Sequence, residues 1–313
     1  MRKFISNLLL LLLLAVANSC IYKELWYGSS ETAEVRVDYD WTGSGHENPS
    51  TPMGLYLYAD YGSSSQFYQT GSSSAVIQVP IGEYGAIAVT QGSDVIRFRG
   101  SDDRDTFQAY TGETKSFGPS LLSKSVPRAT GAEAESMILE PDFLCRGVAQ
   151  EISVTLTGED QRILMQMQEA LYICNITIRN VENLRYAQSV SATISGLAAS
   201  LYLSDGSPSR ESVTEPFDCI SDGQSVVRGT LRSFGPAAGD VRNCLVLYFI
   251  LSDGQKIYYT FDVTDAFAKA QAAHSLEVEI NIDKIPLPKP IVNGGGYAPS
   301  VDEWQIHYVD LNM

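Results

Sequence analysis

The sequence predicts a mostly β protein, built as two β-sandwich domains in tandem with little helix. Apolar and polar residues alternate with a period of two through most of the chain, which is the pattern of half-buried strands. Clusters of Gly, Ser, Pro and Asp separate these segments, as turns do between strands. Helical character is confined to short segments. Many short strands with frequent turns are typical of β-sandwiches.

The first predicted strand covers residues 35–41. Val35, Val37 and Tyr39 fall on one face of it and charged residues fall on the other. Since successive side chains of a strand point to opposite faces, one face should be buried and the other solvated. Further strands are predicted at 55–59, 75–79, 84–89, 152–156, 171–179 and 190–195.

The C-terminal part contains a predicted hairpin and the most regular strand of the chain. Apolar runs at 245–251 and 257–263 flank a turn-forming Ser-Asp-Gly cluster, which favours a β-hairpin. Residues 276–283 alternate strictly between apolar and polar side chains. A last short strand is predicted at 304–308.

Helix is predicted in the alanine-rich segment 265–273, with a single further turn at 120–123. Residues 117–141 have no sustained periodicity, so the domain boundary is placed near residue 147. Three prolines between 286 and 290 exclude a helix and a central strand there. We therefore expect a linker at 20–31, a first sandwich at 32–147, a second sandwich at 148–285 and an extended tail at 286–313.

The first twenty residues have the layout of a bacterial lipoprotein signal. Two basic residues are followed by a leucine run at 8–14 and by small residues that lead to Cys20. This apolar run is too short for a spanning helix. We expect a signal peptide at 1–19 and a lipid on Cys20, which becomes the new N-terminus. The alternative is an ordinary secreted protein whose Cys20 pairs in a disulfide.

The chain is acidic, with 22 Lys and Arg against 37 Asp and Glu and a formal net charge of −15. Removal of the signal takes away two positive charges and no negative one. Such a surface disfavours nucleic acid and anionic lipid headgroups as partners. Attachment to a membrane should therefore depend on the lipid of Cys20, and no nucleic-acid partner is expected.

Four further cysteines remain in the mature chain, and an exported protein is free to form disulfides. Cys174 alternates in phase with neighbouring apolar residues, which favours free buried thiols over bridges. The sequence leaves the three possible pairings open. The absence of a C-x-x-C spacing argues against a redox or zinc role. The cysteines concerned are Cys145, Cys174, Cys219 and Cys244.

No constellation of catalytic or metal-binding residues is evident, so no enzyme activity, cofactor or metal site is expected. The histidines His46, His274 and His307 are far apart, and each is interpreted as a solvated surface residue. No nucleophile elbow, S-x-x-K motif or P-loop occurs. The acidic cluster 102–105 lacks the spacing of a calcium loop and is interpreted as a solvated turn.

Tyrosines are frequent, with 17 in the chain, and several gather in the first predicted sandwich. Exposed aromatic side chains of this kind line glycan-binding platforms and protein interfaces. Tyr56 and Tyr58 alternate with leucines, however, which favours packing on the second face of a sandwich strand. We prefer the packing interpretation and keep a glycan platform as the alternative.

Several segments together resemble a family of Bacteroidales lipoproteins of about this length. These are the lipoprotein signal, residues 35–41, 79–84, 258–264 and 287–290, and the ending through Trp304. The resemblance covers essentially the whole mature chain. That family is similar to the fimbrillin and fimbrium-anchor lipoproteins, the minor subunits that tether adhesive pili to the outer membrane.

The resemblance implies two tandem transthyretin-like (Greek-key) β-sandwiches and assembly by β-strand addition, in which one subunit completes the sheet of its neighbour. It also implies a protein that is not an enzyme. Lys23 and Glu24 partly resemble the signal that sends such lipoproteins to the cell surface.

We therefore expect a lipid-anchored protein of the outer membrane at the cell surface, acting as a fimbria-like anchor or adhesion subunit. Its partners would be fimbrillin-like subunits or a host or bacterial surface ligand, contacted by a sheet edge or by the tail. The alternative is a glycan-binding surface lipoprotein.

Overall fold

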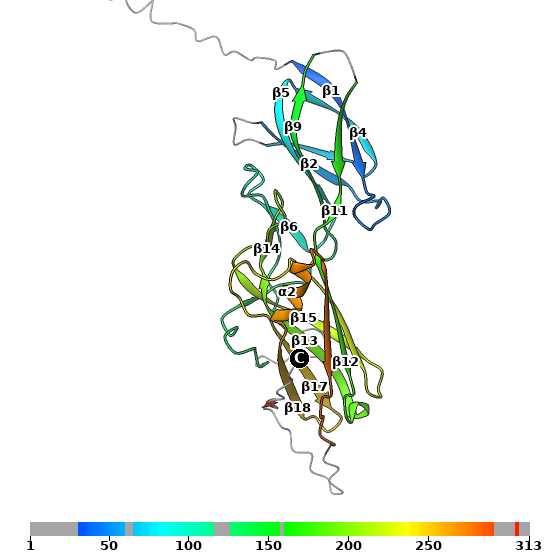
Figure 1. Cartoon of the computed structure of the whole chain (residues 1–313), viewed down its shortest axis with the longest axis vertical. Helices are drawn as coiled ribbons and strands as arrows, with labels where there is room; N and C mark the ends of the chain where they lie inside the picture. Colours follow the sequence, from blue (N-terminus) through cyan, green and yellow to red (C-terminus); the bar gives the residue numbers. More distant parts are fainter. Residues whose placement is uncertain (1–30, 60–64, 116–125, 157–159, 291–303, 307–313) are drawn as a thin grey trace, which may run out of the picture.

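The structure is a computed structural model that describes residues 31–59, 65–115, 126–156, 160–290 and 304–306. The molecule is elongated, with two groups of strands that follow one another along its long axis (Figure 1). The prediction of a mostly β fold with little helix is confirmed.

The first group of strands is a sandwich of two sheets. One sheet has the order β10-β1-β4, with β1 parallel to β10 and antiparallel to β4. The other has the order β11-β9-β5-β2-β3 with antiparallel neighbours. The bounds are β1 Thr32–Asp40, β2 Met53–Ala59, β3 Ser65–Thr70, β4 Ser74–Pro80, β5 Gly82–Thr90, β9 Cys145–Val154, β10 Gln161–Gln166 and β11 Gln168–Glu169.

The two sheets of this sandwich share one apolar core. Val35 and Val37 of β1 are buried, as the alternation predicts, and they join Leu55 and Leu57 of β2 in the same cluster. Strands β4, β5, β9 and β10 contribute further buried residues to it. Burial of one face from each sheet is what holds a β-sandwich together.

The second group is one continuous set of strands in the order β19-β12-β16-β15-β13-β17-β18-β20, with the short β8 beside β15. Strand β15 belongs to both halves of it, because residues 212–218 pair with β13 and residues 219–221 pair with β16. The bounds are β8 Ser136–Met137, β12 Tyr172–Arg179, β13 Ala187–Ala198, β15 Ser212–Ser221, β16 Val227–Ser233, β17 Cys244–Leu251, β18 Lys256–Asp262, β19 Glu277–Asp283 and β20 Trp304–Ile306.

A second apolar core lies within this group. It contains buried residues from β12, β13, β17, β18 and β19. The predicted helix is present as α2 (Thr264–Ala272), which adds Phe267 and Ala270 to the same core. A single-turn 3₁₀ helix, η1 (Leu184–Tyr186), adds Leu184. The predicted hairpin is confirmed by the antiparallel pairing of β17 with β18.

A small sheet and an apolar cluster join the two sandwiches. Strand β7 (Gln108–Thr111) pairs on one side with β6 (Ile96–Arg99) and on the other with β14 (Ser200–Tyr202), which comes from the C-terminal half. The cluster, called here the joint cluster, takes residues from both halves of the chain. Its members are Tyr56, Tyr58, Ile87, Val89, Ile96, Phe107, Ala109, Leu144, Ala170, Leu171, Ala198, Leu201, Leu203 and Phe234.

The chain crosses between the two sandwiches more than once, whereas we expected a single crossing near residue 147. We expected the second sandwich to begin at residue 148, but β9, β10 and β11 pair with strands of the first sandwich. Residues 126–137, which we expected to belong to the first domain, cover β17 and pair with β15 of the second. No change in amino-acid composition marks the point at which the chain returns to the first sandwich.

Several strands have no clear signal in the sequence, among them β3, β10, β15 and β16. Their apolar residues follow no strict alternation in the sequence. In β10 the apolar residues are consecutive, and in β16 they are sparse, although burial alternates along both strands in the structure. The bulge in β13 is similar. Its register shifts between Ile194 and Leu197, and Gly196 between them has a φ of +76°, where a Cβ would collide with the carbonyl oxygen of Arg242. The expected turn at 120–123 lies outside the described residues.

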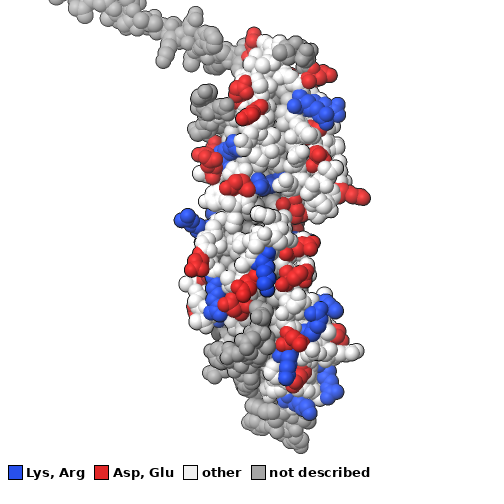
Figure 2. All heavy atoms as spheres, viewed as in Figure 1, with Lys and Arg blue, Asp and Glu red and all other residues white. Residues whose placement is uncertain are grey.

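Charged side chains are spread along the whole visible face of the molecule, with basic groups interspersed among the acidic ones (Figure 2). In the described part of the chain, no helix has both the length and the apolar character needed to cross a membrane.

The joint cluster predicts a large cost for Leu144→Ala. Leu144 is fully buried in it, so its truncation should lower the free energy of unfolding by about 2–5 kcal/mol. Leu164→Ala is the matched control, because Leu164 of β10 is 47% exposed and its truncation should cost less than about 1 kcal/mol. Urea denaturation of the two variants measures the difference, and equal losses would contradict the packing described here.

Candidate functional site

The two ends of the described chain lie far apart on the molecule. Cys20, the predicted lipidation site, lies outside the described residues. Strand β1, the first described strand after it, begins at one end of the elongated molecule, whereas β18 lies towards the other end (Figure 1). A tether before β1 and a partner at β18 would therefore act from opposite poles.

The expected extended tail begins inside the second sandwich. Ile285 and Leu287 are buried in its core, at 0% and 2% exposure. The hydroxyl of Tyr259 donates to the carbonyl oxygen of Pro286 at 2.6 Å, and the side-chain amide of Asn183 donates to that of Leu287 at 2.7 Å. Residues 286–287 are thus docked, and they pack as part of the domain.

The predicted last strand is present as β20, which adds to an edge of the second sandwich. It runs parallel to β18, with Lys256 opposite Trp304 and Tyr258 opposite Ile306. The pairing covers only the first three residues of β18. In the described part of the chain, no strand lies beside residues 260–262 on that side. This is a partly filled sheet edge, the kind of surface that accepts an added strand.

The opposite edge of the same sheet is formed by β19, which is acidic. Glu277, Glu279 and Asp283 are all exposed on it. Two of them accept hydrogen bonds: Glu279 from Asn175 of β12 at 3.0 Å, and Asp283 from Asn180, the residue after β12, at 2.7 Å. Helix α2 packs beside this strand. Charged side chains on an edge oppose pairing with a further strand, so the β18 edge is the better candidate.

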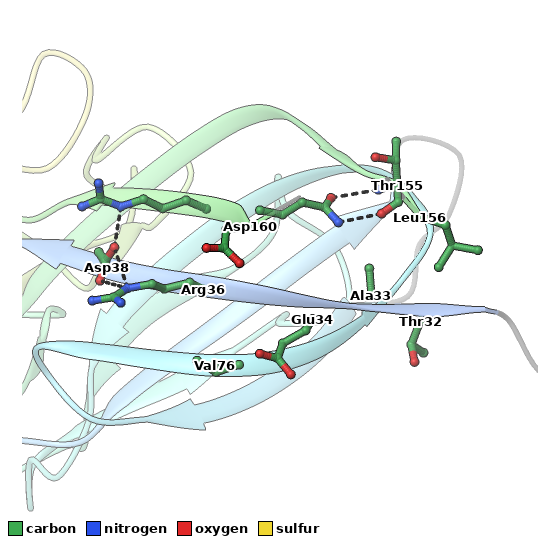
Figure 3. Close-up of a pocket in the computed structure, with 11 residues that line it drawn as sticks. Thr32, Ala33, Glu34, Arg36, Asp38, Val76, Thr155, Leu156 and Asp160 are labelled. Carbon is green, nitrogen blue, oxygen red and sulfur yellow. Dashed lines mark hydrogen bonds and ion pairs between the residues drawn. The ribbon is translucent and has the colours of Figure 1, made fainter. Parts of the chain in front are cut away.

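A hollow of about 830 Å³ lies over β1 and the start of β10 in the first sandwich (Figure 3). Asp38 lies at one end of it (Figure 3) and accepts from the guanidinium groups of Arg36, at 3.0 Å, and Arg162. These two hydrogen bonds lower the pKa of Asp38 below its usual range. Both arginines already bind this carboxylate, so the other charged groups of the hollow are the exposed carboxylates of Glu34 and Asp160. Its remaining walls include the exposed Val76 and Leu156.

The tyrosines considered as a glycan platform are buried in the joint. Tyr56 and Tyr58 are 9% and 5% exposed and belong to the joint cluster. The ring of Tyr56 lies 4.5 Å from that of Phe107, centre to centre. Phe67 is exposed beside it, at 52%. The packing interpretation is therefore confirmed for both tyrosines, and the glycan hypothesis loses the two residues on which it mainly depended.

The four cysteines of the sandwiches are free thiols, as the sequence analysis favoured. Cys145, Cys174 and Cys244 are buried and Cys219 is half-buried. Burial, more than neighbouring carboxylates, raises the pKa of Cys145 and of Cys219 to about 12. Such thiols stay protonated at neutral pH and are poor nucleophiles.

The histidines fall into three different situations. His274 is exposed, as expected, with a φ of +51° just after α2. His307 lies outside the described residues. His46 is also exposed, as expected, but it has partners that the sequence does not indicate: its Nε2 lies 2.5 Å from a carboxylate oxygen of Glu169 and its ring meets that of Phe143 edge-on. Cys145 lies beside this pair. No sequence signal predicts the contact, since the partners are about a hundred residues or more apart.

The acidic cluster 102–105 forms the turn between β6 and β7. Its three aspartates are exposed, and Asp103 accepts a hydrogen bond at 2.8 Å from the backbone N–H of Asp105. The interpretation as a solvated turn is confirmed.

The chain shares its fold with solved structures that are described as an adhesin and as a fimbrial anchor protein. The chain aligns with a solved structure described as a "putative adhesin" from Bacteroides ovatus, with a TM-score of 0.62 and 18% identity over 83% of this chain and 95% of the other. It also aligns with the fimbrial anchor protein Mfa2 from Porphyromonas gingivalis, with a TM-score of 0.52 and 14% identity over 81% and 91% of the two chains.

The chain belongs to the family DUF5119, a domain of unknown function whose match covers residues 19–218. A curated relative from Bacteroides ovatus, named "Putative fimbrium anchoring subunit Fim4B", is 22% identical over 73% of this chain and 74% of its own length. The resemblance inferred from the sequence is confirmed by these similarities.

One buried acid in the second sandwich has no evident structural partner. Glu215 of β15 is fully buried, and neither of its carboxylate oxygens has a hydrogen-bond partner in the described part of the chain. Burial, and secondarily the nearby carboxylate of Glu140, raise the pKa of Glu215 well above its usual range. Burial thus favours the neutral form of this carboxyl within the fold.

Glu215 should make the protein less stable as the pH rises. The unfolded chain loses this proton near pH 4.3, the usual value for Glu, whereas the folded chain keeps it to higher pH. The free energy of unfolding should therefore fall as the pH is raised above about 4.3. Glu215→Gln should flatten this slope in urea titrations at several pH values. The control Glu211→Gln, at an exposed position, should keep it, and an unchanged slope in Glu215→Gln would contradict the assignment.

Proposed function

We propose that this protein is a cell-surface subunit that anchors or caps a fimbria-like adhesive filament at the outer membrane. The observation that supports this best is the fold, which the chain shares along most of its length with a fimbrial anchor protein and an adhesin-like structure. The name of the curated relative points to the same role. We expect no catalytic activity, since the relatives are named as adhesin or fimbrial anchor proteins and not as enzymes.

The proposed tether is a lipid on Cys20. The signal-like segment before it supplies the context in which such a cysteine is acylated, and two or more acyl chains hold a protein on a bilayer stably. The linker from residue 20 would then connect the membrane to β1 at one pole of the molecule. This arrangement leaves the second sandwich pointing away from the membrane.

The proposed contact with the next subunit is strand addition at the β18 edge. The β20 pairing occupies part of this edge and is short, whereas the β19 edge carries exposed acids. A longer strand from a partner would extend the ladder along residues 260–262 and gain backbone hydrogen bonds that β20 does not make. In exchange, the tail would be released to pair elsewhere.

The experiment that tests the function is recovery of partners from crosslinked cells. An affinity-tagged chain should recover fimbrillin-like subunits after crosslinking of whole cells. Recovery of none, from cells that display filaments, would contradict the anchor or cap function.

The tether is tested by Cys20→Ser. The hydroxyl cannot accept the thioether-linked lipid, so the variant should leave the membrane fraction and fail to incorporate labelled palmitate. Cys219→Ser is the matched control and should stay membrane-bound, because Cys219 lies half-buried in the second sandwich. Retention of Cys20→Ser in washed membranes would overturn the proposed anchor.

The role of the tail is tested by removing residues 291–313. The thermal midpoint should change little, because β20 pairs with only three residues of β18. Recovery of fimbrillin-like partners should change if the tail occupies the β18 edge in competition with the partner. A second variant that replaces residues 304–306 by Gly-Ser-Gly keeps the length of the tail and removes the strand. It therefore distinguishes the effect of the β20 pairing from the effect of tail length. Unchanged recovery from both variants would exclude the tail from the contact.

A further inference from the structure

We propose that His46, Cys145 and Glu169 form a zinc-binding site in the first sandwich. One ligand atom from each residue, a ring nitrogen, the thiol sulfur and a carboxylate oxygen, lies within 4.8 Å of the other two. Nitrogen, sulfur and oxygen donors of this kind are the set that Zn²⁺ binds in proteins. The absence of a C-x-x-C spacing had argued against a zinc role. The structure instead assembles donors from three separate segments.

Strand pairing brings two of the ligands together. Glu169 of β11 and Cys145 of β9 are directly opposite each other in an antiparallel pair. Side chains at such positions lie on the same face, with their Cβ atoms about 4.5–5.5 Å apart. His46 comes from the loop after β1 and reaches over this pair. The position of the cluster is therefore set by the sheet register.

Surrounding groups orient each ligand. One oxygen of Glu169 accepts from the backbone N–H groups of residues 170 and 171, both at 3.2 Å, which leaves the other oxygen directed at His46. The His46 ring packs edge-on against Phe143, with 5.1 Å between ring centres. The backbone N–H of Cys145 donates to the hydroxyl of Thr90 at 3.1 Å. Ordered partners of this kind fix ligand geometry in metal sites.

Charge and exposure fit a divalent ion of borderline softness. A thiolate and a carboxylate would neutralise Zn²⁺, with the thiol proton released to solvent when the Zn–S bond forms. The thiolate disfavours Ca²⁺ and Mg²⁺, which prefer oxygen. Cys145 is fully buried, whereas the His46 side chain is 40% exposed and that of Glu169 is 17% exposed. The ion would enter from the His46 side, and water would complete a tetrahedral shell.

Only small side-chain movements are needed. Tetrahedral zinc places its ligand atoms about 3.3–3.6 Å from each other, given the usual bond lengths. The nitrogen of His46 and the oxygen of Glu169, now 2.5 Å apart, must separate slightly to admit the ion. His46 can move because it is partly exposed and lies in a loop. The alternative is that His46 and Glu169 form only an ion pair that holds this loop.

The site would strengthen the end of the first sandwich that faces the second. Residues 144 and 170–171, next to two of the ligands, belong to the joint cluster. A bound ion would link the loop after β1 to β9 and β11 at this point. Zinc should therefore raise the thermal midpoint of the protein, since a ligand that binds only the folded state stabilises it.

The test is metal titration of the purified full-length protein after removal of bound metal. Co²⁺, which occupies zinc sites, should give the near-ultraviolet charge-transfer band of a thiolate ligand. Zn²⁺ should abolish this band by displacement and raise the thermal midpoint. Cys145→Ser should lose the band. Cys20→Ser and Cys174→Ser should keep it, which assigns the thiolate to Cys145.

The other ligands are tested by the zinc dissociation constant, measured in competition with a chromogenic chelator. His46→Ala and Glu169→Gln should weaken binding by more than the about 10- to 100-fold that loss of a mere outer-shell partner costs. His46→Cys, which offers another zinc ligand, should restore it. His274→Ala is the control and should bind as the unmodified chain does. Circular dichroism and the metal-free midpoint check that each variant folds.

Two results would overturn the proposal. One is a full-length protein that gives no thiolate band and no zinc-dependent rise in the midpoint, which would leave His46 and Glu169 as an ion pair only. The other is a Cys145→Ser variant that is folded and binds zinc as tightly as the unmodified chain.

Discussion

The apolar cluster between the two sandwiches is the interaction on which the shape of the molecule depends. Each sandwich has a core of its own, so each could in principle pack without the other. The joint cluster adds side chains from both, including the fully buried Phe107 and Phe234. Each such side chain contributes about 1.5–3 kcal/mol when it leaves water. Arg146 adds hydrogen bonds across the joint, to the carbonyl oxygens of Leu203 at 3.1 Å and Asp205 at 2.9 Å. The joint is therefore a packed interface, and it holds the sandwiches in line.

A rigid joint matters because it separates the two poles. The described chain starts at β1 at one end, and the partly filled edge of β18 lies towards the other (Figure 1). A hinge between the sandwiches would let the distal edge fold back, whereas a packed joint keeps it extended. The crossing segments reinforce this, since β7 pairs with β14 and β8 pairs with β15. The same crossings explain why the chain does not divide into two consecutive sequence blocks.

The two edges of the sheet in the second sandwich differ in charge. The acids of β19 are exposed and tied to β12, so that edge is protected from further pairing. The β18 edge has no comparable row of acids. Two further polar groups lie elsewhere: Glu215 is buried in the second sandwich, and the cluster of His46, Cys145 and Glu169 lies near the joint. The assembly and the metal binding that we propose would thus involve different parts of the fold.

Residue order by itself determined the fold class, most of the core strands and one helix. Strict alternation identified β1 and β19, and the Ser-Asp-Gly turn identified the β17–β18 hairpin, because these signals are local. It also predicted that Tyr56 and Tyr58 pack inside. Only the tertiary structure decided which strands pair. The parallel partnership of β1 with β10, the return of β9 to the first sandwich and the meeting of His46 with Glu169 join residues distant in sequence. Such contacts form because apolar faces of distant segments are buried in a common core. No local sequence pattern identifies which segment a strand or side chain will meet.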